Sequence, residues 1–270
     1  MSAKPELMRG QTLVDYTNSY RILLLITATV TMIAFILALF IHDVPSDYRS
    51  ETTETKQSKA NKMAMYKKLL SKKTVMWIAY IAGIQLGARL VAVYIPIYLN
   101  NYLYIPRDVT STINTFVQAA MLIGYVFAPF LEKKLGAIVS VAAGTLTCVP
   151  VMLLLANGRR LGSGSVLFVI VGILLFLRTG LANATMPIQQ EVQIVIVDKD
   201  LRPAFTGVVQ IAYAVVGVID GLFTEFYLFN RPDGYANAYY IAAVIYVIAS
   251  VLLLVFFAKK YNRILDDEKK

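Results

Sequence analysis

Long apolar segments separated by polar connections dominate the chain. Each segment is about 20 residues long, which is the length that an α-helix needs to cross the roughly 30 Å hydrocarbon core of a bilayer. Seven such segments occupy residues 22–41, 74–99, 112–131, 136–156, 165–188, 204–228 and 238–258. The pattern therefore predicts an all-α fold, a polytopic membrane protein with seven transmembrane helices.

The composition supports this class. Apolar residues make up 57% of the 270 residues and charged residues only 16%, against roughly 45–50% and 25% in soluble domains. The net charge of +9 could indicate nucleic-acid binding, but in such a chain lysines between apolar segments are better explained as topology determinants. We therefore expect the lipid bilayer, and no nucleic acid, as a partner.

The basic residues predict the orientation. They concentrate in a loop over residues 42–73, in alternate short connections after it, and in a tail over 259–270. Because cytoplasmic segments of membrane proteins are rich in lysine and arginine, this loop and tail are predicted to be cytoplasmic and residues 1–21 to form an extracytoplasmic N-terminal tail. The plasma (cytoplasmic) membrane is the expected location.

The basic loop contains the stretch "KMAMYKKLLSKK". Its apolar residues Met63, Tyr66 and Leu70 have helical spacing among lysines, which is typical of a short helix lying on an anionic leaflet. A solvated basic tether is the alternative.

Seven spans with the N-terminus outside also suit a seven-helix receptor or rhodopsin. The segment 238–258 has no lysine to hold a retinal, and the lone Cys148 has no partner for an intrachain disulfide. A seven-helix receptor-like protein remains an alternative class.

A different grouping sets one helix apart from six. The loop over 42–73 separates the lone transmembrane helix 22–41 from the segments within 74–258, which divide into two triplets. The first helix of each triplet places an arginine between a glycine and a proline, in "GIQLGARLVAVYIPI" with Arg89 and "GILLFLRTGLANATMPI" with Arg178. Three-helix units repeated with inverted topology, a 3+3 repeat, are common in secondary transporters.

Two further stretches make the comparison more specific. "GYVFAPFLEKKLGAI" has Gly124, Glu132, Lys134 and Gly136, similar to a cytoplasmic loop signature, and "DLRPAFTGVVQIAYAVVGVIDG" follows at 200–221. With these motifs the chain resembles the C-terminal half of a major facilitator superfamily transporter, helices six to twelve of that fold. The resemblance implies a six-helix half-bundle over 74–258 and a second half, from a longer gene or a second polypeptide.

Four ionisable residues lie inside the predicted spans: Arg89, Arg178, Asp220 and Glu225. A charge at the centre of a membrane helix costs at least about 2.5–3.5 kcal/mol, so such residues usually face the bundle interior and have partners. At about 1.5 Å per residue, Arg89 and Asp220 lie at a similar depth, which predicts an ion pair. Glu225 lies near the outer end, within reach of headgroups.

The functional hypothesis makes Asp220 a protonation site, with burial opposing its charge and an arginine favouring it. Substrate and proton would compete there, whereas a static ion pair would serve packing alone. The family resemblance places Gln85, Arg89, Arg178 and Asn183 in the central cavity, and two arginines favour an anionic or carboxylate-bearing substrate.

Enzyme signatures are not apparent. One histidine and one cysteine do not suggest a metal cluster, and no phosphate-binding glycine loop is followed by a lysine. We expect no enzyme activity, cofactor or metal. The sequence predicts a secondary active transporter of a small molecule that works by alternating access, with proton-coupled efflux preferred. A truncated, non-transporting membrane protein is the alternative.

Overall fold

The computed structural model describes residues 10–39, 69 and 71–262. The chain divides into two units, residues 1–58 and 59–270. The first contains one long helix, α1 (Gly10–Leu39), whereas the apolar pattern predicts a helix over 22–41. Its apolar stretch is Leu24–Leu37. The short amphipathic helix expected around Met63 and Leu70 lies outside the described residues.

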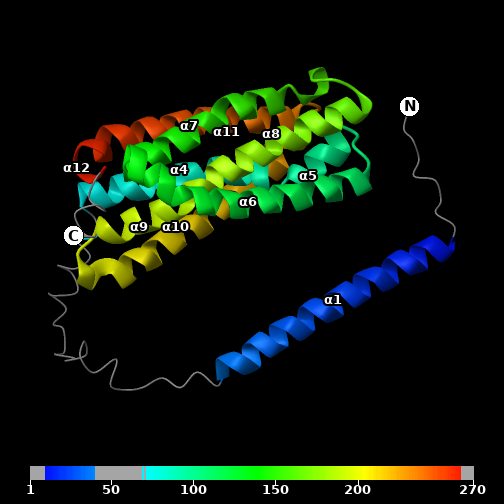
Figure 1. Ribbon diagram of the computed structural model, residues 1–270, viewed down its shortest axis with the longest axis horizontal. Coiled ribbons are helices and arrows are strands. Elements are labelled where there is room, and N and C mark those ends of the chain that lie inside the picture. The colour runs from blue at the N-terminus through cyan, green and yellow to red at the C-terminus, as the bar shows by residue number, and fades with distance from the viewer. Residues whose placement is uncertain (1–9, 40–68, 70, 263–270) are drawn as a thin grey trace. The chain divides into compact units, whose positions relative to one another are not determined.

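The second unit is a bundle of six apolar spans (Figure 1). Their elements are α4 (Lys72–Ala92), α5 (Ile95–Ile97) and η1 (Tyr98–Tyr102); α6 (Arg107–Leu135); α7 (Ala137–Ala156); α8 (Gly164–Ala184) and α9 (Met186–Val195); α10 (Arg202–Phe223) and η4 (Thr224–Leu228); and α11 (Gly234–Leu253), η5 (Leu254–Ala258) and α12 (Lys259–Tyr261). Two short helices, η2 (Gly158–Arg160) and η3 (Lys199–Leu201), lie in connections. All regular structure in the described ranges is helical, which confirms the all-α polytopic fold.

Two of the spans are interrupted next to a proline. α4 ends at Ala92, and Pro96 lies in the first turn of α5; α8 ends at Ala184, and Pro187 lies in the first turn of α9. Proline has no N–H group and disfavours helical geometry in the residue before it. These are the two segments in which the sequence places an arginine between a glycine and a proline, and both arginine-bearing helices end about two thirds of the way along their spans.

Small residues bring α6 and α8 into close contact. Gly124 on α6 faces the backbone of Gly180 and Ala184 on α8, and Gly180 in turn faces Ala120 of α6. Each helix thus contributes two small residues spaced four apart, the spacing that lets membrane helices approach closely. This packing fixes the position of α8, which carries Arg178.

The α6–α7 turn is held by the end of α12. Gly136 has a φ of 82°, and Asn262 contacts the turn on both sides: its Nδ2 donates to the Leu135 carbonyl at 3.1 Å, and its Oδ1 accepts from the Val139 amide at 2.9 Å. The backbone carbonyl of Asn262 also accepts from the Ala137 amide at 2.8 Å. The turn therefore depends on a residue far away in the sequence.

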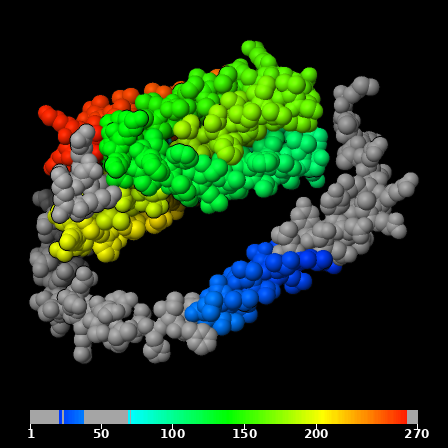
Figure 2. Space-filling model, in the orientation of Figure 1, coloured from blue at the N-terminus to red at the C-terminus, as the bar shows by residue number. Residues whose placement is uncertain are grey.

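The buried side chains form two main clusters along α4. One contains Trp77 and Tyr80 near the start of the helix, and the other begins at Val91 and continues through Tyr98. Figure 2 shows the closely packed outer surface of the bundle over α6, α7 and α8. Between the two clusters the middle of α4 borders a cavity.

Candidate functional site

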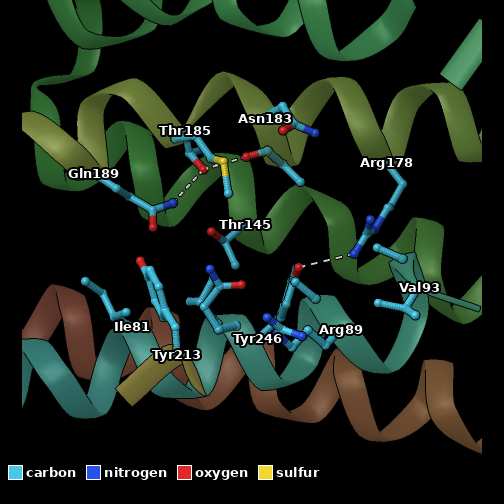
Figure 3. A pocket seen from close by; sticks show the side chains of 16 residues that line it. Ile81, Arg89, Val93, Thr145, Arg178, Asn183, Thr185, Gln189, Tyr213 and Tyr246 are labelled. Atoms are coloured by element: carbon cyan, nitrogen blue, oxygen red, sulfur yellow. Dashed lines mark hydrogen bonds between the residues drawn. The ribbon is translucent and has the colours of Figure 1, made fainter. Parts of the chain in front are cut away.

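A cavity of about 380 Å³ lies in the middle of the bundle (Figure 3). It is bordered by the middle of α4, by α7, by the junction of α8 and α9, and by α10 and α11. The lining residues with polar side chains are Gln85, Arg89, Thr145, Arg178, Asn183, Thr185, Gln189, Tyr213 and Tyr246. Six of the described helices thus contribute to one polar cavity.

Arg178 is fixed at the cavity wall. Its side chain is only 3% exposed, and its Nη2 donates a hydrogen bond to the Tyr246 hydroxyl at 3.4 Å. Its Nε has no hydrogen-bond partner among the described residues. Tyr246 comes from α11 and lies against Gly87 of α4, where a Cβ atom would approach the tyrosine ring to 2.9 Å. The small residue at Gly87 therefore gives the tyrosine the space to reach Arg178.

Arg89 borders the cavity from α4 and is half-buried. Its guanidinium lies over Gly217 of α10, where a Cβ atom would come within 3.2 Å of Nη1. Asp220, about one turn further along α10, is 3% exposed, and its Oδ1 has no hydrogen-bond partner in the described part of the chain. Arg89 acts on this carboxylate electrostatically. The cationic side chain thus lies between the cavity and a buried acid.

The expected direct ion pair between Arg89 and Asp220 is not formed in the described structure. Arg89 stops at Gly217, one helical turn short of the carboxylate. Asp220 also does not line the cavity. Glu225 is exposed in η4 and lies away from the cavity. Of the candidate residues in the spans, the structure brings together Arg89, Arg178, Gln85 and Asn183.

Amide side chains line the cavity together with the two arginines. The Asn183 Nδ2 donates to the Thr179 carbonyl at 2.8 Å, and its Oδ1 accepts from the Tyr125 hydroxyl at 3.5 Å. Gln189 donates through Nε2 to the Thr185 hydroxyl at 2.9 Å. These bonds orient the polar groups, so the cavity presents a defined set of donors and acceptors.

Sequence reasoning missed part of this lining. Tyr213, Tyr246, Thr185 and Gln189 were not among the candidates. Tyrosine is common at membrane interfaces, so a tyrosine in an apolar segment is a weak indication that it lines a cavity. Gln189 offered a usable signal, because it follows the helix break at Pro187, where irregular backbone at membrane depth requires polar surroundings.

The loop-signature residues lie elsewhere. Gly124 is inside α6 and packs on α8, Glu132 and Lys134 lie near the end of α6, and Gly136 makes the turn into α7. None of these residues lines the cavity. In the described ranges no group of three or more His, Cys, Asp or Glu could hold a metal ion.

The fold and the site define a class: a polytopic helical membrane protein with a polar, arginine-bearing cavity inside its bundle. The model of the Major Facilitator Superfamily matches residues 10–221, and the chain belongs to that superfamily. It is therefore a membrane transporter of this type, acting on small molecules. No curated protein and no solved structure matches the chain.

Proposed function

We propose that the chain forms the substrate-binding half of a secondary transporter for small organic anions, working by alternating access. The observation that carries this proposal is the charge of the cavity. Arg89 and Arg178 both line it, and no Asp or Glu is among the described lining residues. A buried guanidinium without a carboxylate is costly inside a membrane protein, and an anionic substrate supplies the missing charge.

The size and lining of the cavity narrow the substrate class. A volume of about 380 Å³ is near the lower end of ligand pockets, which span roughly 300–1,000 Å³. Apolar residues such as Ile81, Ile84 and Ala88 border the cavity beside the arginines. We infer a small molecule with one or two carboxylates and a short apolar body, oriented by the amides of Gln85 and Gln189.

The position of Arg89 suggests how a proton is coupled to this anion. An ionised Asp220 attracts the Arg89 guanidinium toward α10, in competition with a substrate in the cavity. Protonation of Asp220 removes that attraction, so that Arg89 can bind the anion in the cavity. Proton and anion then occupy the protein together, whereas direct competition for Asp220 would make them alternate.

We therefore propose proton-coupled efflux in which the anion leaves the cell together with a proton, driven by its own concentration gradient. In this proposal the loop over 42–73 and the tail over 259–270 lie in the cytoplasm, the N-terminus lies outside, and the plasma membrane is the location. The pattern of basic residues supports the proposed orientation.

A second helical body completes the transporter in this proposal. Apolar side chains on α6 and α10 are strongly exposed, among them Phe116 at 61%, Val126 at 67% and Val218 at 63%. Such faces need lipid or another helix against them. We propose that the chain corresponds to the C-terminal half of the family fold, and that the remaining helices of that fold, from a longer gene or a second polypeptide, cover part of these faces.

Flux in reconstituted vesicles tests the proposal. Vesicles containing the chain, alone and with a candidate partner, are loaded with small mono- and dicarboxylates, and anion release is measured together with the movement of protons. Anion release accompanied by protons in the same direction is expected. Anion movement without protons would contradict the coupling, and release of cations alone would contradict the substrate class.

Three variants assign the roles. Arg178→Gln removes a charged donor whose hydrogen bonds to an anion are worth about 1.5–3 kcal/mol, so a 10- to 150-fold weaker apparent affinity is expected. Asp220→Asn is expected to keep anion exchange but to lose its proton dependence. The control Arg107→Gln removes an exposed arginine outside the cavity and should change neither. Equal losses in Arg107→Gln and Arg178→Gln would refute the assignment.

A further inference from the structure

A basic groove, separate from the cavity, lies at one end of the bundle. It is formed where α4 begins and where η5 and α12 end, and its volume is about 370 Å³. Lys72, Lys73 and Lys260 line it together with Met76 and Phe256. We call this surface, defined by these five residues, the basic groove. It shares no residue with the central cavity.

The lysines of the basic groove have no acidic counterpart in the part of the chain that the structure describes. No Asp or Glu within residues 10–39, 69 and 71–262 lines the groove, and none of the three lysines makes an ion pair with a residue of these ranges. Lys72 instead places its Nζ over the Phe256 ring, 5.7 Å from the centroid. Three amines gathered from two helices repel one another, so a bound anion stabilises this arrangement.

The floor of the basic groove is apolar. Phe256 is 45% exposed, whereas its neighbour Phe257 is 1% exposed and packs edge-on against Trp77 at 5.4 Å. Met76 lies about one helical turn beyond Lys72 on α4, toward the middle of the span. The groove therefore changes from cationic at the end of the helices to apolar further along them.

This change coincides with the ends of two membrane spans. The span Lys72–Tyr102 begins at the groove, and the span Gly234–Tyr261 ends there. In a bilayer the lysines then lie at headgroup level, and Phe256 and Met76 lie beside the first part of the acyl chains. Basic pockets between transmembrane helices are suited to anionic lipid headgroups.

We propose that the basic groove binds an anionic phospholipid. Its phosphate contacts the amines of Lys72, Lys73 and Lys260, and one acyl chain lies along Met76 and Phe256. The charge of the groove selects an anionic headgroup, and its apolar floor selects a lipid over a free phosphate ion. The bound lipid joins the start of α4 to the end of α11 and η5.

Native mass spectrometry of the full chain in detergent tests this directly. The protein is titrated with phosphatidylglycerol and with phosphatidylcholine of the same acyl chains. The wild type is expected to bind phosphatidylglycerol at least about tenfold more tightly. Each lysine near an anionic surface contributes about 1 kcal/mol, which is about fivefold in affinity. Lys72→Gln with Lys260→Gln should therefore weaken that binding by about 30-fold.

A matched pair of variants separates the groove from general surface charge. Lys199→Gln with Lys259→Gln removes two exposed lysines that do not line the groove. Lys199 begins the span Lys199–Leu228, and Lys259 lies next to Lys260. This control should keep the preference, as should Lys72→Arg with Lys260→Arg, which retains the charge. If the control loses as much affinity as the groove variant, the proposal is wrong.

Soluble anions separate the two possible sources of phosphate. Inorganic phosphate and glycerol phosphate, added at the concentration of the lipid, should not displace phosphatidylglycerol from the wild type. Displacement at equal concentration would overturn the lipid assignment and make the groove a site for soluble anions. Equal binding of phosphatidylcholine and phosphatidylglycerol would also overturn it.

Discussion

The close approach of α6 and α8 at Gly124 leads to a sharp prediction, because a single methyl group has no space there. A Cβ atom at this position would lie 3.0 Å from the Ala184 amide nitrogen and closer still to the Gly180 carbonyl oxygen. Ordinary Cβ contacts are 3.4 Å or longer. Both neighbours are backbone atoms, so no side-chain rotation relieves the contact in Gly124→Ala and the helices must separate.

The magnitude follows from this geometry. Overpacking a tightly packed interior costs about 1–3 kcal/mol. The matched control is Gly207→Ala on α10, where nothing lies within 4 Å of the added Cβ. There the methyl group favours the helix by about 0.5–1 kcal/mol. The two glycine-to-alanine variants should therefore differ in free energy of unfolding by about 1.5–4 kcal/mol, with opposite signs relative to the wild type.

Reversible unfolding of the purified chain by SDS in mixed micelles measures this difference. A second readout is the apparent affinity for the anion, because Arg178 and Asn183 lie on the same helix as the displaced Gly180 and should shift with it. If Gly124→Ala is as stable as Gly207→Ala, the close packing of α6 on α8 does not exist as described, and the position assigned to Arg178 loses its support.

Two further changes test other contacts. Asn262→Ala removes the side-chain hydrogen bonds to the Val139 amide and the Leu135 carbonyl. A lost capping bond costs about 1 kcal/mol, so the rate of hydrogen exchange at the Val139 amide should rise about fivefold. Exchange rates in the middle of α7 should not change. Tyr246→Phe removes the only side chain that hydrogen-bonds Arg178 in the described structure. Because a less firmly held guanidinium binds an anion less well, we expect a loss of about 0.7–1.4 kcal/mol in binding free energy, which is a 3- to 10-fold lower apparent affinity for the anion. An unchanged affinity would refute the orienting role of Tyr246.

Much of the architecture could be predicted from the order of residues alone. Segments of about 20 apolar residues form helices in a bilayer because every backbone hydrogen bond must be satisfied within the segment. Prolines mark the interruptions near Arg89 and Arg178, but Pro129 and Pro150 lie inside the continuous helices α6 and α7. A proline in the sequence therefore does not by itself determine a break. The family was predicted from local motifs, and the match over residues 10–221 confirms it.

Helix ends were less well predicted than helix existence. The helix predicted over 112–131 extends over Arg107–Leu135 in the structure, and α1 begins at Gly10 rather than at residue 22. Hydropathy marks the apolar centre of a helix, whereas its ends are polar and continue outside the apolar run. The pattern therefore gives the number of segments better than their limits.

Which polar residues meet depended on tertiary structure. Estimates of depth placed Arg89 and Asp220 at one level, but the rotation of α4 and α10 about their axes directs Arg89 over Gly217 and leaves Asp220 outside the cavity. Tyr246 reaches Arg178 only because Gly87 leaves space for its ring. The sequence by itself determined the spans, because these depend on interactions within a segment. The cavity and the basic groove were decided by helix packing, because their residues are distant in the chain and meet only when rotation and separation of the helices are set.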